Sequence, residues 1–263
     1  VSLGLNLDSG IYSVVVKFKG LLNYTPITKY ANVTIEPTVK GLDVVKMFRN
    51  NTQYYAIFTD SQGNFLKNKN IQFNINGVFY TRTTNDKGIA MMNINLNPGK
   101  YVITAKNLVT GEQSGNNITV KSLIVQKDLT KYYLNASKFQ TTIYNKDGSL
   151  AVNKEVTFNI NGVFYHRTTD SNGVASLGIS LRPGEYIITT MFDGLAIGNK
   201  VTVLPTLVTK NLNMKYLDGS SFTAQTLNGQ GKPLANQNVS FNVNGVFYYK
   251  VTDNNGMAKL NIR

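Results

Sequence analysis

The chain has 263 residues, enough for two or three domains, and its hydrophobic fraction of 42% can supply packed cores. It has no cysteine, which excludes disulfides, thiol catalysis and Cys-ligated metals. Lys and Arg outnumber Asp and Glu by 27 to 14, which favours anionic partners. We nevertheless expect no nucleic-acid binding, because the basic residues are scattered and neither a recognition helix nor an RNA-binding signature is present. Since no apolar run approaches the roughly 18 residues of a membrane helix, we expect no direct membrane insertion by this segment.

One sequence pattern occurs three times along the chain. Its Asn-Gly pair recurs 85 residues apart from Asn76 to Asn161, and 83 residues apart from Asn161 to Asn244. A Thr and a polar turn ending in Gly follow each copy. A Leu-x-Pro-Gly-x-Tyr element comes next at residues 96–101 and 181–186, and residues 7–12 repeat it without the Pro. Such self-similarity indicates an array of repeats.

The repeats predict four segments. Residues 1–35 form the C-terminal strands of a partial repeat, residues 36–122 and 123–204 form complete repeats, and residues 205–263 form a repeat that lacks its last strands. Val1 aligns with Ala175 and Arg263 with Ser180, so the first and last segments are complementary parts of one repeat. Two explanations stay open: the chain is a window on a longer array, or a neighbouring copy completes the last repeat.

The middle repeat shows the strand pattern in full. Alternation and turn residues predict strands at 124–129, 138–144, 156–160, 163–169, 174–180, 186–192 and 200–203, with no helical periodicity. Seven short strands in about 83 residues predict an immunoglobulin-like sandwich, with a Tyr corner at the Leu-x-Pro-Gly-x-Tyr element. The chain is therefore expected to be all-β, with tandem Ig-like β-sandwiches arranged as a rod, because the joints between repeats are short and lack Gly/Ser linkers.

The Asn161-Gly162 turn leaves one register open. A two-residue hairpin loop would place Val163 and Tyr165 on the face of Phe158. A three-residue loop would turn Phe164 inward instead, because a slip of one residue exchanges the two faces of a strand.

Candidate ligand-binding residues recur as aromatic and basic pairs, two residues apart and therefore on one face of a strand. Exposed pairs would suit sugars or an anionic wall polymer, whereas pairs that face inward would belong to the core. The pairs are Tyr80 with Arg82, Tyr165 with Arg167, and Tyr248 with Lys250.

Catalysis and metal binding are not expected. His166 is the only histidine, and its equivalents are Thr81 and Tyr249, so no triad is indicated. The carboxylates concentrate at turns, where Asp bonds to its own backbone, and no bidentate Glu follows at a calcium-loop spacing. The carboxylates at turns are those of Asp60, Asp86, Asp147, Asp170 and Asp253. We therefore predict no enzyme activity, no cofactor and no metal.

Three elements together carry a family resemblance. They are Gly-x-Leu-x-x-Asn-x-x-Val-x-Phe-x-Ile-Asn-Gly at 148–162, Tyr-x-Arg-x-Thr-Asp at 165–170, and the Leu-x-Pro-Gly-x-Tyr element at 181–186. This combination resembles the Ig-like repeats of adhesin-like surface proteins of methanogenic archaea, and more distantly bacterial invasin-type Ig-like domains. The resemblance spans essentially the whole chain and implies an extracellular, cell-surface or cell-wall location; no catalytic residues come with it.

The expected function is that of a structural stalk or fibre segment of a cell-surface adhesin, with head-to-tail assembly into filaments as one form. The alternative is a repeat module that itself binds carbohydrate or anionic cell-wall polymer; a viral fibre is a third alternative. Expected partners are other copies of the chain or further repeats, and cell-wall polymer or glycans.

Overall fold

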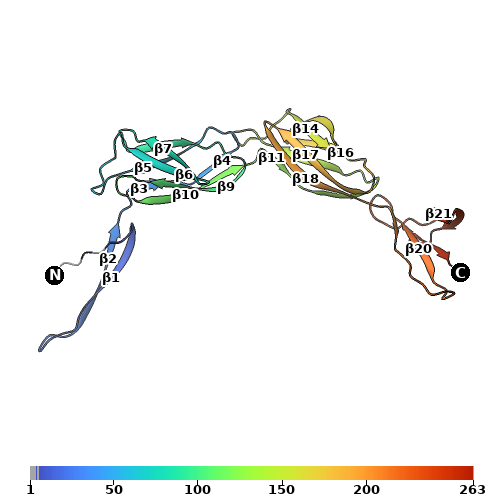
Figure 1. Cartoon of the computed structure of the whole chain (residues 1–263), viewed down its shortest axis with the longest axis horizontal. Helices are drawn as coiled ribbons and strands as arrows, with labels where there is room; N and C mark the ends of the chain where they lie inside the picture. The colour runs from blue at the N-terminus through green and yellow to red at the C-terminus, as the bar shows by residue number, and fades with distance from the viewer. Residues whose placement is uncertain (1–3, 5, 263) are drawn as a thin grey trace. The chain divides into compact units, whose positions relative to one another are not determined.

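The computed structural model describes residue 4 and residues 6–262, and its regular elements are all β-strands (Figure 1). Two compact units divide the chain, residues 1–122 and residues 123–263. Among the described residues, no helix has the length and apolarity needed to cross a membrane.

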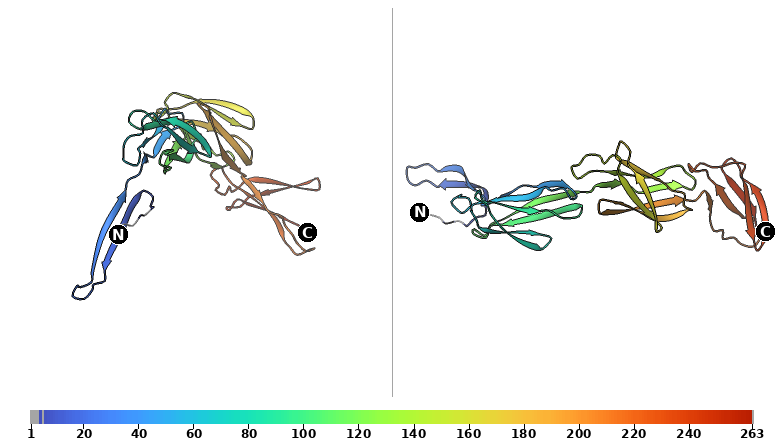
Figure 2. Two further views of the ribbon diagram at one scale, coloured as in Figure 1. Left: turned by 60° about the vertical axis from the view of Figure 1, so that its left-hand side comes forward. Right: turned by 90° about the horizontal axis from the view of Figure 1, so that it is seen from above.

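The first unit contains a hairpin and a sandwich. In the N-terminal hairpin, β1 (Gly10–Phe18) and β2 (Ile27–Ile35) pair antiparallel, and only with each other among the described residues. The first sandwich has one sheet in the order β3-β5-β8 and another in the order β4-β10-β9-β6-β7. Two further views of the ribbon show the N-terminal hairpin in blue (Figure 2). Its strands are β3 (Val39–Gly41), β4 (Val44–Met47), β5 (Gln53–Phe58), β6 (Asn70–Ile75), β7 (Val78–Thr83), β8 (Ile89–Asn93), β9 (Gly99–Lys106) and β10 (Gln113–Lys121).

The second unit contains a complete sandwich and an open one. The second sandwich has sheets β11-β13-β16 and β12-β18-β17-β14-β15, which repeat the order of the first. The open sandwich has sheets β19-β20-β23 and β21-β22. The strands are β11 (Ile124–Gln126), β12 (Leu129–Tyr132), β13 (Lys138–Ile143), β14 (Glu155–Ile160), β15 (Val163–Thr168), β16 (Val174–Gly178), β17 (Gly184–Phe192), β18 (Leu195–Leu204), β19 (Leu207–Thr209), β20 (Ser221–Thr226), β21 (Asn238–Val243), β22 (Val246–Val251) and β23 (Met257–Asn261).

Strand order identifies both complete sandwiches as immunoglobulin-like. In the larger sheet of the second sandwich, the last two strands, β17 and β18, insert between β12 and the hairpin of β14 and β15. The first sandwich repeats this arrangement with β9 and β10. Seven strands result in each when the divided first strand is counted once, as in an immunoglobulin-like sandwich. The expectation of an all-β chain with tandem Ig-like sandwiches is confirmed.

The first strand of each complete sandwich differs from the sequence prediction. Residues 124–129 alternate as one strand would, but β11 lies in the small sheet and β12 in the large one, where β12 runs parallel to β18. Asp128 stands at the break, and its Oδ1 accepts hydrogen bonds from Lys200 N (2.9 Å) and Asn199 Nδ2 (2.7 Å). These bonds, above all the one from Asn199, lower the pKa of Asp128. The carboxylate thereby holds the kinked first strand to the last strand of the larger sheet.

The core and the Tyr corner follow the repeat. An edge-to-face aromatic pair joins the sheets of each sandwich, as in Phe139 and Phe158, whose ring centres are 6.0 Å apart. Tyr186 Oη donates to Arg182 O at 2.8 Å, which confirms the expected corner. The N-terminal hairpin makes the same bond from Tyr12 to Asp8 O without the Pro.

Candidate interaction surfaces

The predicted aromatic and basic pairs lie on the edge strands of the larger sheets. Arg82 stacks over Tyr80 on β7 and Arg167 over Tyr165 on β15, with the guanidinium carbon 5.7 Å and 6.0 Å from the ring centres. Tyr248 and Lys250 occupy the same places on β22. The basic side chains are exposed, and Tyr80 and Tyr165 are half-buried. Each of the three pairs belongs to a different sandwich.

The hairpin turn settles the register. Asn161 and Gly162 both have positive φ, 52° and 78°, as a two-residue type I′ turn requires. Tyr165 therefore lies opposite Phe158, on the core-facing side of an edge strand. The pair at 165 and 167 caps the rim of the core instead of standing on the outer face. Phe164 points the other way and is 60% exposed.

A second aromatic recurs on the outer face of the edge strands, and the sequence alone did not indicate it. Phe79, Phe164 and Phe247 are exposed by 64%, 60% and 55% on strands β7, β15 and β22. A large apolar side chain that recurs at an exposed position is a candidate contact residue. The signal was present in the triple recurrence, but only the turn geometry shows which aromatic of the Phe-Tyr pair faces outward.

The turn carboxylates bond to their own backbone. Asp170 Oδ1 accepts hydrogen bonds from Asn172 N (2.8 Å) and Val174 N (2.9 Å). Asp253 does the same, whereas Asn85, not Asp86, occupies this place in the first sandwich. Over residue 4 and residues 6–262, no group of three or more His, Asp or Glu side chains is arranged to hold a metal ion.

His166 lies in an exposed polar cluster on β15. Its Nδ1 is 3.3 Å from Glu155 Oε1 and 3.2 Å from Thr157 Oγ1. A hydroxyl activated by a His–carboxylate pair needs contacts to opposite ring nitrogens. Here the acid and the hydroxyl share one nitrogen, so this cluster lacks the geometry of a catalytic relay.

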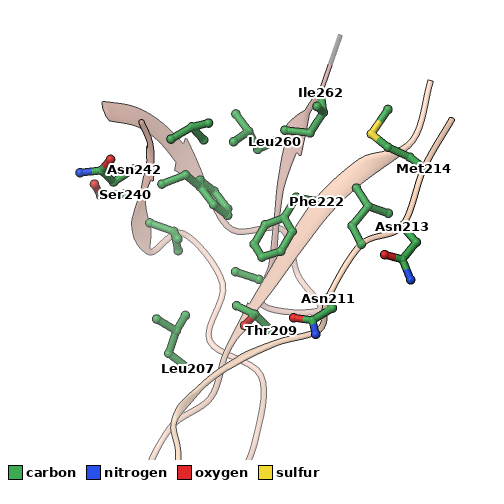
Figure 3. A pocket seen from close by; sticks show the side chains of 15 residues that line it. Leu207, Thr209, Asn211, Asn213, Met214, Phe222, Ser240, Asn242, Leu260 and Ile262 are labelled. Carbon is green, nitrogen blue, oxygen red and sulfur yellow. The ribbon is translucent and has the colours of Figure 1, made fainter. Parts of the chain in front are cut away.

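The open sandwich carries a groove of about 770 Å³ between its two sheets (Figure 3). Phe222 and Leu260 face into it from the small sheet, and Phe241 from β21. In the second sandwich, β17 and β18 cover the equivalent surface. Among the described residues of the open sandwich, no strand takes their place.

Apolar side chains that line the groove are more exposed than their equivalents in the second sandwich. Leu207 is 55% exposed, whereas Ile124 at the same place in the second sandwich is 3% exposed. Val243 is 41% exposed and its equivalent Ile160 only 4%. The groove is thus the uncovered half of a hydrophobic core.

Comparisons with known proteins return structural neighbours only. No family model matches the chain, and no curated protein matches it. Similar solved structures include a Ca²⁺-stabilised adhesin with which an Antarctic bacterium binds ice (14% identity over 97% of this chain and 74% of that one, TM-score 0.23). A second is the Bacteroides ovatus protein SGBP-B of a mixed-linkage glucan utilization locus with a bound heptasaccharide (14% identity over 77% of this chain and 55% of that one, TM-score 0.25). A third is a chimeric titin Z1Z2 tandem (14% identity over 63% of this chain and 95% of that one, TM-score 0.28). With TM-scores below 0.5 these neighbours do not bear on function, and the fold assignment rests on strand order.

Proposed function

We propose that this chain is a structural segment of a cell-surface adhesin, a stalk or fibre built from Ig-like repeats bounded at 35/36, 122/123 and 204/205. The observation that carries the proposal is the directness of the joints. Only two or three residues separate the last strand of one repeat from the first of the next: β2 from β3, β10 from β11, and β18 from β19. Joints this short restrict bending, as a rod-like spacer requires.

Contacts within the second unit support a stiff joint. Asn135 Nδ2 of the second sandwich donates to Gly229 O of the open sandwich at 2.6 Å. Gly231 in the same loop has a φ of 74°, and a Cβ there would collide with the Tyr132 ring. The two sandwiches therefore meet through a close contact in which glycine is required.

The resemblance of the repeats to adhesin-like proteins of methanogenic archaea supports an extracellular, cell-wall or cell-surface location. Antibodies against the repeats should label intact cells of the source organism. Labelling that appears only after lysis would contradict the surface location.

Stiffness can be tested separately by X-ray scattering of the purified chain. Gly231→Ala should change the distribution of interatomic distances, because the new methyl group forces Tyr132 and the loop apart. Gly219→Ala is the matched control, since Gly219 has a similar φ of 79° but no atom within 4 Å of the place that a new methyl group would take. Equal scattering from both variants and the parent would argue against a joint fixed by this contact.

A second function, binding of carbohydrate or anionic wall polymer by the repeats, is favoured by the edge strands. Each displays an exposed Phe on one face and an aromatic–basic pair at the rim of the other. On this proposal, Phe164→Ala and Arg167→Ala weaken retention on an immobilised anionic polysaccharide without lowering the melting temperature. Retention should also grow steeply with repeat number. If neither substitution changed retention, the binding function would be rejected and only the stalk function would remain.

A further inference from the structure

We propose that the groove of the open sandwich binds the N-terminal hairpin of a second copy of this chain, so that copies join head to tail. This inference deepens the fibre role proposed above and rests on it for its biological setting. The physical claim, that the chain is self-complementary, stands on the hairpin and the groove alone.

The hairpin has the construction of the two strands that fill a complete sandwich. Gly10 pairs with Ile35 at its open end, as Gly184 pairs with Val203 in β17 and β18. The Tyr12 corner bond has the same length, 2.8 Å, as the Tyr186 bond. The hairpin is therefore already folded in the form that the groove requires, which lowers the entropic cost of docking.

The pairing in the second sandwich specifies the intermolecular register. Phe158 lies opposite Thr190 and Ile160 opposite Ile188 in the antiparallel pair of β14 and β17. The same alignment places Phe241 opposite Val16 of the second copy, and Val243 opposite its Val14. The backbone groups along the free edge of β21 would then be hydrogen-bonded.

The parallel pair of β12 and β18 specifies the other side of the groove. Leu129 lies opposite Val201 and Tyr132 opposite Leu204. By the same alignment Leu212 would face Val33 of the second copy, and Lys215 would face its Glu36, a pair of opposite charges. Residues 211–215 are not a strand in the open sandwich, since the strand with which they would pair is not among the described residues. Docking would supply it.

Side-chain chemistry also suits the exchange. Val16 and Val33 are 59% and 46% exposed on the hairpin, whereas their equivalents Thr190 and Val201 are fully buried. Thr190 Oγ1 is buried in the second sandwich with no hydrogen-bond partner among the described residues. Val16 would bring a methyl group to that place instead of a hydroxyl, so this side chain would carry no unpaired polar group into the apolar core.

Light scattering coupled to size-exclusion chromatography tests the proposal on the whole chain. The parent should show a mass that rises with concentration above the monomer value of 29.1 kDa. Val16→Glu on the hairpin, or Val243→Glu in the groove, should each return the mass to that of the monomer. A mass of 29.1 kDa at every concentration for the parent would overturn the proposal, whether the groove stays open or another segment covers it.

Matched controls separate docking from general surface effects. Ile11→Glu lies on the outward face of β1, where the second sandwich has Glu185, and should leave association intact. Val246→Glu lies outside the groove, where the equivalent Val163 is 50% exposed in a complete sandwich, and should also have no effect. If the control variants were monomeric as well, association would have to involve another apolar surface, and the proposal would be contradicted.

Mixing the two disabled variants gives the sharpest result. The Val16→Glu chain keeps a functional groove, and the Val243→Glu chain keeps a functional hairpin. An equimolar mixture should therefore form a dimer joined by a single hairpin–groove contact, with twice the monomer mass and nothing larger, because the remaining hairpin and groove are both disabled. A mixture that stays monomeric would contradict head-to-tail docking even if the parent associates.

Register can be trapped covalently, because the chain has no cysteine of its own. Asn159 lies opposite Thr189, which places Asn242 opposite Val15 of the second copy. Opposed residues of antiparallel strands are within disulfide distance. The double variant Asn242→Cys/Val15→Cys should oxidise to a ladder of multimers, whereas Asn242→Cys/Ser13→Cys, two residues out of register, should not. Failure here bears on self-association only, since surface labelling tests the adhesin role independently.

Discussion

The second sandwich and the open sandwich have closely similar sequences but different amounts of structure. Phe139 and Phe158 are fully buried in the second, where two central strands close the larger sheet. In the open sandwich Phe222 is only half-buried, although its ring meets Phe241 at the same 6.0 Å and 88°. The small sheet and the aromatic pair therefore form without the last two strands, whereas the larger sheet is reduced to the hairpin of β21 and β22.

The largest expected effect comes from truncating the shared core aromatic. Phe158→Ala should destabilise the second sandwich by about 3–5 kcal/mol, because it leaves a cavity in a closed core. Phe241→Ala should cost less, because its surroundings are already partly open to solvent. Denaturant unfolding followed by hydrogen exchange can assign each loss to its sandwich. If the two substitutions lowered the free energy of unfolding equally in dilute solution, the groove of the open sandwich would have to be covered under those conditions.

The aromatic position on the small sheet provides a pH test of a closed core. Tyr54 of the first sandwich replaces Phe139, and burial, with a further contribution from the charge of Asp43, raises the pKa of Tyr54 from 10.0 to about 12. The unfolded chain ionises first, so this stability is present below about pH 10 and is lost as the pH rises through about 12. The loss should reach about 2–3 kcal/mol. Tyr54→Phe should abolish it, and a pH dependence unchanged in the variant would refute this origin.

A smaller effect, equal in both sandwiches, is expected at the recurring Thr turn. Thr169 Oγ1 donates to Ala151 O and accepts from Lys154 N, and Thr252 makes the corresponding bonds to Leu234 O and Gln237 N. Thr169→Val and Thr252→Val should each cost about 1–3 kcal/mol, because they leave buried backbone groups unpaired. Thermal unfolding of both variants measures this. A much smaller cost for Thr252→Val would mean that the turn held by Thr252 is less stable in the open sandwich than the corresponding turn in the second sandwich.

The smallest effect is expected at Lys131, which is 6% exposed and donates to Ile179 O at 2.7 Å. Met214 stands at this position in the open sandwich. Lys131→Met should change stability at neutral pH by less than about 1.5 kcal/mol. Burial lowers the pKa of Lys131, so the parent gains stability as the pH rises toward 10.5, and the variant should lack this gain. Calorimetric scans at several pH values measure this rise in stability. If the variant showed the same rise, the rise would come from a titratable group other than Lys131.

Most of the fold could be predicted because the repeat marks each turn. Asn-Gly at 161–162 indicated a hairpin, and the Leu-x-Pro-Gly-x-Tyr element marked the corner that Tyr186 forms. The division of the first strand at Asp128 could not be predicted, because residues 124–129 alternate as one strand would. Only tertiary pairing, parallel to β18 on one side of the break, separates β11 from β12.

The interaction surfaces were harder to predict than the fold. The recurrence of Tyr165 and Arg167 was visible, but their place at the rim depends on a turn whose length the sequence left open. Exposure of Phe164 depends on β15 being an edge strand, which is a property of the whole sheet order. Complementarity of the hairpin and the groove was indicated by alignment, whereas the register needs the strand pairs of the second sandwich.

Strand order also has a consequence for biosynthesis. In each complete sandwich the last two strands to be synthesised occupy the middle of the larger sheet, so long-range contacts close the fold late. Until β17 and β18 leave the ribosome, an emerging repeat exposes an acceptor for any hairpin of the same kind, including that of the preceding repeat. Sequence divergence between neighbouring repeats would therefore protect a growing array from misfolding by exchange.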